Sequence, residues 1–243
     1  MRYSCRSCPL RKQEFFAPMS GDEIQAMQRF KVGELAVEAG TPLLMEGSNS
    51  PQLFTALSGQ GVRYKTLPNG RRQVITFVFP GDFLGLQAGV MAEMQHSAEA
   101  TTDMLLCVFD RSELWTFFRT HPERGYDMTW LCAVEEHFLG ESILTLGQRS
   151  ALERVAWAFL QIWARLEALG LRQDGWVPLP HRQQDLADAL GLSLVHTNKT
   201  IRQLRNMQVA TWSDGRLSVS DIDRLEEIAQ TERDEAVRLR PLF

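Results

Sequence analysis

Residues 182–207 constrain the fold of this chain most strongly, because they read as two short helices joined by a tight turn. Residues 184–190 place leucine and alanine side chains on one helical face. Gly191 can end this first helix in a left-handed backbone conformation, and Ser193 can cap a second helix over residues 194–207. This order of helix, glycine turn and capped helix is typical of a helix-turn-helix, whose second helix enters the major groove of DNA.

The outward face of the second helix is polar and basic, while its inward stripe is aliphatic. On such a helix Asn198 can pair with adenine, and Lys199 and Arg202 can donate hydrogen bonds to guanine. Arg205 lies farther along the helix and is better placed to contact a phosphate. The predicted DNA-contacting residues are Ser193, His196, Thr197, Asn198, Lys199, Arg202 and Arg205.

The charge of this region differs from that of the whole chain. The 243 residues contain 26 Lys and Arg against 30 Asp and Glu, a net charge of −4 that argues weakly against a nucleic-acid partner. Residues 189–213 contain three Lys or Arg and no acidic residue, so positive charge is concentrated there. Asp214-Gly215 then predicts a hairpin, the wing of a winged helix. A solvated basic helix in an unrelated α domain is less favoured, because turn, cap, cationic face and wing follow in the required order.

Residues 32–109 are expected to form β-structure, because short apolar stretches recur there about every 8 to 12 residues between Gly, Pro and Asn. Such spacing is typical of a sandwich, roll or barrel. Asn69 and Gly70 can supply the two positive-φ residues that a tight hairpin needs. The expected strands are Leu43 to Met45, Leu53 to Leu57, Val62 to Tyr64, Val74 to Phe79 and Met104 to Phe109.

Three capping signals predict helix starts near residues 21, 111 and 151. In each, a Ser or Asp precedes by three residues a Glu that can return the hydrogen bond. The pairs are Ser20 with Glu23, Asp110 with Glu113, and Ser150 with Glu153.

Residues 122–148 contain no interior proline and can form one helix of roughly 35 to 40 Å. Leu131, Val134 and Phe138 follow a 3-4 spacing on one stripe. This favours a helix that pairs with a second copy of itself, and Glu141 at the next heptad position would then face its counterpart. Packing on the chain's own β-domain is the alternative interpretation.

A β-roll, a long helix and a C-terminal winged helix in this order resemble the CRP/FNR family of bacterial transcription regulators over nearly the whole chain. Residues 67–73, 79–86 and 190–200 carry the resemblance. It implies a homodimer that binds a two-fold double-stranded DNA operator with one recognition helix per half-site, and RNA polymerase as a further partner. The FNR branch usually reads DNA with a Glu-x-x-Ser-Arg set. Val195, Asn198 and Lys199 replace that set here, so the operator preference of that branch is not expected.

The predicted class is α+β, with four parts. They are an N-terminal Cys-containing arm (1–19), a cyclic-nucleotide-binding-like β-roll sensor domain (20–121), a dimerisation helix (122–149) and a winged helix-turn-helix DNA-binding domain (150–243). No apolar run approaches the roughly 18 residues that span a bilayer, and the N-terminus lacks an apolar signal-peptide core. A cytoplasmic protein without a membrane partner is therefore expected.

The resemblance does not extend to a cyclic nucleotide. In the cyclic-nucleotide branch, a Gly-Glu pair holds the ribose and an Arg holds the phosphate. In this chain Leu86 follows Gly85, and no Lys or Arg lies between Arg72 and Arg111. A phosphate buried there would lack its counter-charge, so cyclic AMP is not expected as a ligand.

The FNR branch instead holds an oxygen-labile [4Fe-4S] cluster with an N-terminal Cys-x2-Cys-x5-Cys and one later Cys on the roll. Cys5 and Cys8 match the first pair and Cys107 matches the later position, so the resemblance implies these three as metal ligands. Glu14 occupies the third N-terminal position. The fourth ligand therefore stays open between Glu14, Cys132 from the long helix, and a small thiol or water.

The cysteines also allow simpler interpretations. Four cysteines in a chain of 243 residues are too few for a disulfide framework. Cys5 and Cys8 can form a thiol switch or a partial zinc site, while Cys107 and Cys132 can be buried apolar residues. Packing is favoured for Cys132, and the cluster is favoured for the other three.

The expected function is a sequence-specific transcription regulator that responds to oxygen or redox state through an iron-sulfur cluster. One alternative is a regulator without a cluster, constitutive or switched by thiol oxidation or by an apolar small molecule in the roll. Another is a metal- or ligand-binding sensor module that acts through protein contacts. An enzyme is not expected, because no nucleophile-base pair, glycine-rich phosphate loop or paired catalytic carboxylates occurs in the sequence.

Overall fold

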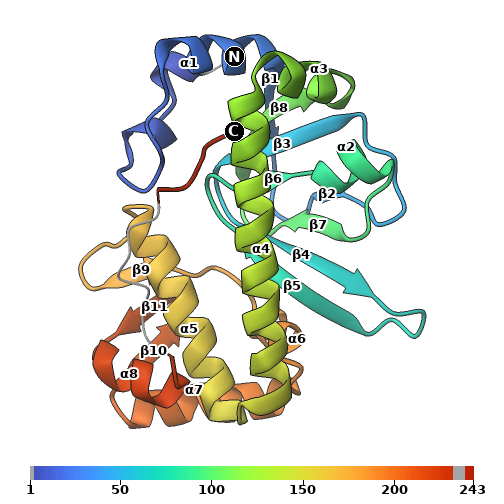
Figure 1. The fold of residues 1–243 in the computed structure, drawn as a ribbon. Helices are drawn as coiled ribbons and strands as arrows, with labels where there is room; N and C mark the ends of the chain where they lie inside the picture. Colours follow the sequence, from blue (N-terminus) through green and yellow to red (C-terminus); the bar gives the residue numbers. More distant parts are fainter. Residues whose placement is uncertain (1–2, 232–238) are drawn as a thin grey trace. The chain divides into compact units, whose positions relative to one another are not determined.

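The computed structural model describes residues 3–231 and 239–243, which belong to two compact units (Figure 1). The first unit comprises Met1–Val134 together with Leu239–Phe243. The second unit comprises Glu135–Arg238.

The first unit is a β-roll flanked by helices. Its two four-stranded antiparallel sheets have the strand orders β1-β8-β3-β6 and β2-β7-β4-β5. The strands are β1 (Lys31–Val37), β2 (Pro42–Leu44), β3 (Gln52–Ser58), β4 (Gly61–Thr66), β5 (Arg72–Val78), β6 (Phe83–Leu84), β7 (Ser97–Ala100) and β8 (Met104–Asp110). The helices are α1 (Gly21–Phe30), α2 (Leu86–Met91), α3 (Leu114–Thr120) and the first half of α4 (Pro122–Gln148). Short 3-10 turns lie at Cys5–Ser7, Leu10–Lys12 and Arg111–Glu113.

The β-roll and all five expected strands are confirmed, each within a few residues of its predicted ends. Side chains of both sheets, among them Phe54, Val78 and Leu106, form one buried apolar core. The strands β1, β6 and β7 were not predicted individually. Their sequences are short or mix polar with apolar residues, so they give no clear alternation.

The hairpin between β4 and β5 differs from the predicted turn. Gly70 has a φ of 82°, but Asn69 is not among the residues with positive φ. The Gly70 N–H donates to the Leu67 carbonyl at 2.9 Å, and the Leu67 N–H donates to the Arg71 carbonyl at 2.8 Å. The Asn69 side chain instead accepts from the Arg71 N–H at 3.0 Å. A longer loop with a single left-handed glycine therefore replaces the two-residue turn.

The capping predictions hold at two of the three sites in full. Ser20 with Glu23 and Ser150 with Glu153 form complete capping boxes at the starts of α1 and α5 (Ala151–Ala168). At the third site Asp110 accepts from the Ser112 N–H at 2.8 Å and begins the 3-10 turn. The α-helical part, α3, starts only at Leu114.

The second unit is a winged helix. It contains the end of α4 and the elements α5, β9 (Trp176–Pro178), α6 (Gln183–Leu190), α7 (Leu194–Asn206), β10 (Ala210–Ser213), β11 (Arg216–Val219) and α8 (Ile222–Ala229). The strands pair in the order β10-β11-β9. Asp214 and Gly215 have φ values of 51° and 71°, so the predicted tight wing turn is confirmed. Buried Trp212 donates from Nε1 to the Leu179 carbonyl at 2.9 Å and ties the wing to the link before α6.

The chain passes from the first unit to the second within α4, between Val134 and Glu135, whereas the sequence placed a domain boundary near residue 150. Arg124, Met128 and Leu131 in the first half of α4 are buried, and Phe138 in the second half stacks on Trp157 of α5. A second difference concerns residues 239–243, which were assigned to the DNA-binding domain and instead lie in the first unit. Among the described residues, no helix is both long and apolar enough to cross a membrane.

We expect Gly81→Ala to destabilise the first unit by roughly 2–4 kcal/mol, as measured by urea unfolding. Gly81 has a φ of 87°, and a Cβ atom there would lie 2.3 Å from Cζ of Phe16, a buried residue of the N-terminal arm. The control is Gly70→Ala, because Gly70 has a similar φ of 82° but nothing within 4 Å of the added atom. Equal losses in the two variants would show that the packing of Phe16 on Gly81 contributes nothing.

We expect the winged helix to lose stability as the pH falls from about 6.5 to 4. Burial lowers the pKa of His181 to about 4, against an opposing contribution from Asp185. Between these pH values the unfolded chain binds a proton at His181 that the folded chain does not. The free energy of unfolding therefore decreases as the pH is lowered, by up to about 3 kcal/mol. Urea unfolding at pH 7 and pH 5 measures the effect. His181→Gln should show a smaller difference between the two pH values, and an unchanged difference would refute the assignment.

Candidate DNA interface and cysteine pocket

The second helix of the motif, α7, is built as the sequence predicts. Gly191 ends α6 with a φ of 62°, and the Ser193 hydroxyl accepts from the His196 N–H at 3.2 Å. Ile201 and Leu204 face inward and are buried. The two helices and the turn between them are thus fixed by local hydrogen bonds and by one apolar stripe.

Four of the predicted contact residues are exposed on α7, namely His196, Lys199, Arg202 and Arg205. Ser193 is also exposed, at the N-cap. Asn198 is half-buried, and its Oδ1 is shielded from solvent without a hydrogen-bond partner among the described residues. The helix therefore presents three permanent positive charges on one solvent-facing side.

Thr197 is a correction to the predicted interface. Its side chain is 0% exposed, and its hydroxyl donates to the Ser193 carbonyl at 3.1 Å. Thr200, one turn farther along the same helix, is also buried and donates to the His196 carbonyl at 2.9 Å. Both hydroxyls satisfy the helix backbone, so neither is available to DNA.

Val195 is an outward residue that was not predicted as a contact. It is 81% exposed in the first turn of α7, next to Ser193 and His196. An apolar side chain at this place can contact the methyl group of thymine. The sequence could have indicated this contact, because a valine on the polar face of a helix has no packing role there.

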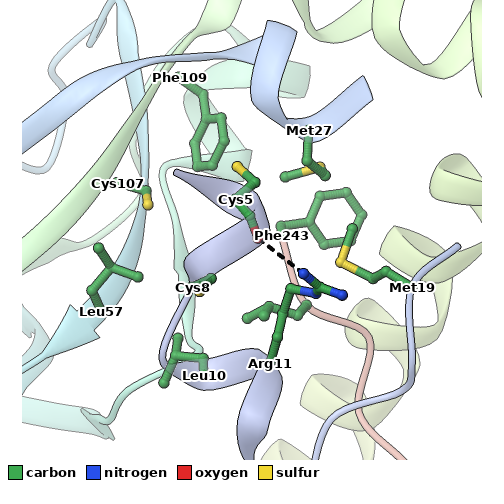
Figure 2. Close-up of a pocket in the computed structure, with 11 residues that line it drawn as sticks. Cys5, Cys8, Leu10, Arg11, Met19, Met27, Leu57, Cys107, Phe109 and Phe243 are labelled. Atoms are coloured by element: carbon green, nitrogen blue, oxygen red, sulfur yellow. Dashed lines mark hydrogen bonds between the residues drawn. The ribbon is translucent and has the colours of Figure 1, made fainter. Parts of the chain in front are cut away.

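The second candidate site is a pocket in the first unit that is lined by two neighbouring cysteines and by a third that is distant in sequence (Figure 2). Cys5 and Cys8 come from the N-terminal arm and Cys107 comes from β8. The remaining lining residues are mostly apolar: Leu10, Arg11, Met19, Met27, Leu57, Phe109, Leu242 and Phe243. The structure therefore places Cys107 at the same pocket as Cys5 and Cys8, as the predicted ligand set requires.

A buried lysine connects the arm to the strands beside this pocket. The Lys31 ammonium donates to the Tyr3 carbonyl at 2.8 Å and to the Glu34 carboxylate at 2.6 Å, and it hydrogen-bonds Cys107. Tyr3 in turn donates its N–H to Glu34 at 2.9 Å. The Cys5 N–H donates to the Gln28 side chain at 2.7 Å. These bonds hold the arm against α1 and β1.

The surroundings of Cys107 and Cys5 favour the neutral thiol over the thiolate. Burial raises the pKa of Cys107 to about 12, although the charge and hydrogen bond of Lys31 act in the opposite direction. Burial also raises the pKa of Cys5. For Lys31, burial acts to lower the pKa, but the hydrogen bond to Glu34 and the charge of Glu34 act in the opposite direction, and the pKa is raised.

The three cysteines are ligands of the type that an iron-sulfur cluster needs, but a fourth ligand is missing among the described lining residues and the cavity is too small for a cluster. Thiolates are the preferred ligands, and three sulfurs line the pocket. Glu14 and Cys132 are both exposed and neither lines it. The cavity measures about 30 Å³, which is room for about two water molecules. Within the described part of the chain, no three Cys, His, Asp or Glu side chains are grouped closely enough to hold a metal ion.

The predicted dimer stripe on α4 lies partly against the chain itself. Leu131 is buried, and Val134 and Phe138 are half-buried, with the Phe138 ring centroid 5.9 Å from that of Trp157. The exposed large apolar side chains of the helix's second half are Leu139, Ile143 and Leu144. Pairing through Leu131, Val134 and Phe138 stays a prediction.

The comparisons with known proteins agree with this architecture. Residues 34–121 match the family model of the cyclic nucleotide-binding domain, and residues 153–228 match that of the Crp-like helix-turn-helix domain. The chain is 30% identical over 226 residues to the nitrogen fixation regulation protein FixK of Bradyrhizobium diazoefficiens, covering 93% of each protein. It is 26% identical to the transcriptional activator protein FnrL of Cereibacter sphaeroides, covering 96% of this chain and 94% of FnrL.

The solved structure of FixK2 from Bradyrhizobium japonicum gives the same result at the level of the fold. It superposes with a TM-score of 0.75 and 25% identity, covering 83% of this chain and 98% of that one. These relatives are transcription regulators and not enzymes. On the evidence of its two matched domains and of FixK, this chain belongs to the CRP/FNR family of transcription regulators.

Proposed function

We propose that this regulator controls transcription in response to oxygen or redox state through the pocket formed by Cys5, Cys8 and Cys107. The observation that carries the proposal is that Cys5 and Cys8 of the arm and Cys107 of β8 line one mostly apolar pocket. An apolar lining of this kind limits the access of solvent to a metal site. A [4Fe-4S] cluster bound there would supply oxygen-labile redox chemistry.

The chain's own residues prepare the pocket for thiolate ligands. Cys5, Cys8 and Cys107 must lose their protons to bind a metal, and Lys31 supplies a buried positive charge beside Cys107. The guanidinium of Arg11 donates to the Cys5 carbonyl at 3.2 Å and holds the turn that carries the first two cysteines. Glu14 or Cys132 would have to move to provide a fourth protein ligand, so a small thiol or water is the simpler completion.

On DNA, we place the N-terminal half of α7 in the major groove. Asn198, Lys199 and Arg202 contact base edges, Arg205 contacts phosphate, and Val195 contacts a thymine methyl group. A homodimer would place one α7 in each half-site of a two-fold operator, and RNA polymerase would be the partner on the promoter. The repulsion expected between paired Glu141 residues is reduced in part, since Arg149 lies 3.9 Å from the Glu141 carboxylate.

We expect protein purified without oxygen to contain iron and sulfide in stoichiometric amounts, with an absorption band that oxygen bleaches. Cys8→Ala should lose the iron, while Cys132→Ala should keep it, because Cys132 is exposed and lies outside the pocket. Operator affinity measured in the same samples should fall with the iron. Wild-type protein without iron and sulfide would reject the cluster and favour a thiol switch or a constitutive regulator.

We expect Arg202→Ala to change the sequence preference of DNA binding and Arg205→Ala to change only its overall affinity. Arg202→Ala should lower operator affinity by about 1–3 kcal/mol, roughly 5- to 150-fold, and relax the preference at one base pair per half-site. Arg205→Ala should weaken binding to all sequences alike and reduce the dependence on salt. Quantitative binding to single-base operator variants at several salt concentrations separates the two. Affinity that does not depend on salt would instead favour a module acting through protein contacts.

A further inference from the structure

Residues 239–243, here called the 239–243 segment, are held in the first unit by backbone hydrogen bonds. Arg240 and Phe16 form a parallel β-bridge. The Arg240 N–H donates to the Phe15 carbonyl and the Ala17 N–H donates to the Arg240 carbonyl, both at 2.9 Å. The segment is thus joined by a single β-bridge to the N-terminal arm that carries Cys5 and Cys8.

The side chains of the segment fill the space next to the cysteines. Leu242 and Phe243 are only 5% and 4% exposed, and both line the cysteine pocket. Figure 2 shows Phe243 beside Met19 and Met27. The Phe243 ring lies 5.4 Å from the ring of Phe83 and 4.5 Å below the guanidinium of Arg124. The small size of the cavity follows from this packing, because two large apolar side chains occupy one of its walls.

Polar contacts anchor the same segment at two further places. The guanidinium of Arg240 pairs with the Asp82 carboxylate of the roll at 3.2 Å. Buried Arg124 of α4 donates a hydrogen bond to the Leu242 carbonyl. Arm, roll and long helix are therefore all joined through one short stretch of chain.

We propose that the 239–243 segment is an intramolecular ligand of the sensor domain, which covers the three cysteines and has to leave before the pocket can hold anything larger than water. Two observations support this. The segment touches the pocket with apolar side chains only, and its polar anchors lie outside the pocket, at Asp82, Arg124 and the arm. Such an arrangement can release without breaking the sheets of the roll.

The segment also links the pocket to the rest of the chain. It follows the winged helix in sequence, separated from the end of α8 by residues that include 232–238, which lie outside the described residues. The chain therefore joins the two units twice, once within α4 and once ahead of Leu239. Release of the segment would end its attachment to the first unit, while the backbone ahead of Leu239 stays intact. This consequence for DNA binding rests on the proposed function, whereas the covering of the cysteines does not.

The test is thiol alkylation of the reduced, metal-free, full-length protein, with each cysteine followed by peptide mass spectrometry. In the double variant Leu242→Ala, Phe243→Ala, we expect Cys8 and Cys107 to react at least tenfold faster than in the wild type. Leu239→Ala is the matched control, since Leu239 belongs to the same segment but is 42% exposed, and its rates should equal those of the wild type. Exposed Cys132 serves as the internal reference, with the same rate in every variant.

A milder variant guards against unfolding of the double variant. Arg240→Ala removes the ion pair with Asp82 but keeps the side chains of Leu242 and Phe243. Because the segment is then held less firmly, Cys8 and Cys107 should be alkylated severalfold faster than in the wild type. Unchanged rates in both variants, with far-UV circular dichroism like that of the wild type, would overturn the proposal. Faster alkylation in a protein that never binds iron would support the segment as a cover and reject the cluster, so the two proposals fail separately.

Discussion

The buried guanidinium of Arg124 holds together the parts of the first unit that are not strands of the roll. It is 2% exposed and pairs with Asp127 at 2.8 Å and with Glu23 of α1 at 3.4 Å. It also donates to the Leu242 carbonyl and covers the Phe243 ring. A buried charge is tolerated only where it is paired, so the positions of α1, α4 and the 239–243 segment depend on one another through this side chain.

The carboxylates around Arg124 show the electrostatic side of this dependence. Burial acts to raise the pKa of Glu23, but hydrogen bonds from Ser20 and the charge of Arg124 outweigh it and lower the pKa. The same Glu23 completes the capping box of α1. The start of α1 and the start of α4 therefore share one ion pair, and neither can shift without weakening the other.

Local features of the structure could be predicted from sequence because few residues decide them. Gly191 and Ser193 determine the turn and the cap of α7, and Asp214-Gly215 determines the wing. The prediction for Asn69-Gly70 was wrong, since Gly70 alone adopts a positive φ while Asn69 satisfies the loop with its side chain. The prediction for Thr197 was wrong for a similar reason, because helical spacing near the edge of a face does not separate an outward hydroxyl from one bonded to the backbone.

Features that join distant segments were beyond sequence reasoning. The family resemblance brought Cys5, Cys8 and Cys107 together, but no pattern in residues 239–243 indicates that they leave the winged helix and pack beside these cysteines. Lys31 was equally hidden, since a lysine at the start of a strand is normally solvated. Its burial against Glu34 and Cys107 is visible only in the folded chain.

A signal in the cysteine pocket changes DNA affinity only if it changes the relative free energies of two arrangements of the winged helices, one that binds DNA well and one that does not. The contacts around Arg124 provide a physical route for such a difference. Arg124 belongs to α4, which continues into the second unit, and it holds the carbonyl of Leu242, whose segment follows the winged helix in sequence. Displacement of Leu242 would leave this buried guanidinium with one acceptor fewer at the start of α4. The same event would thus change the contacts of the chain at α4 and at the 239–243 segment, the two places where it passes between the units, so it could act on an entire domain.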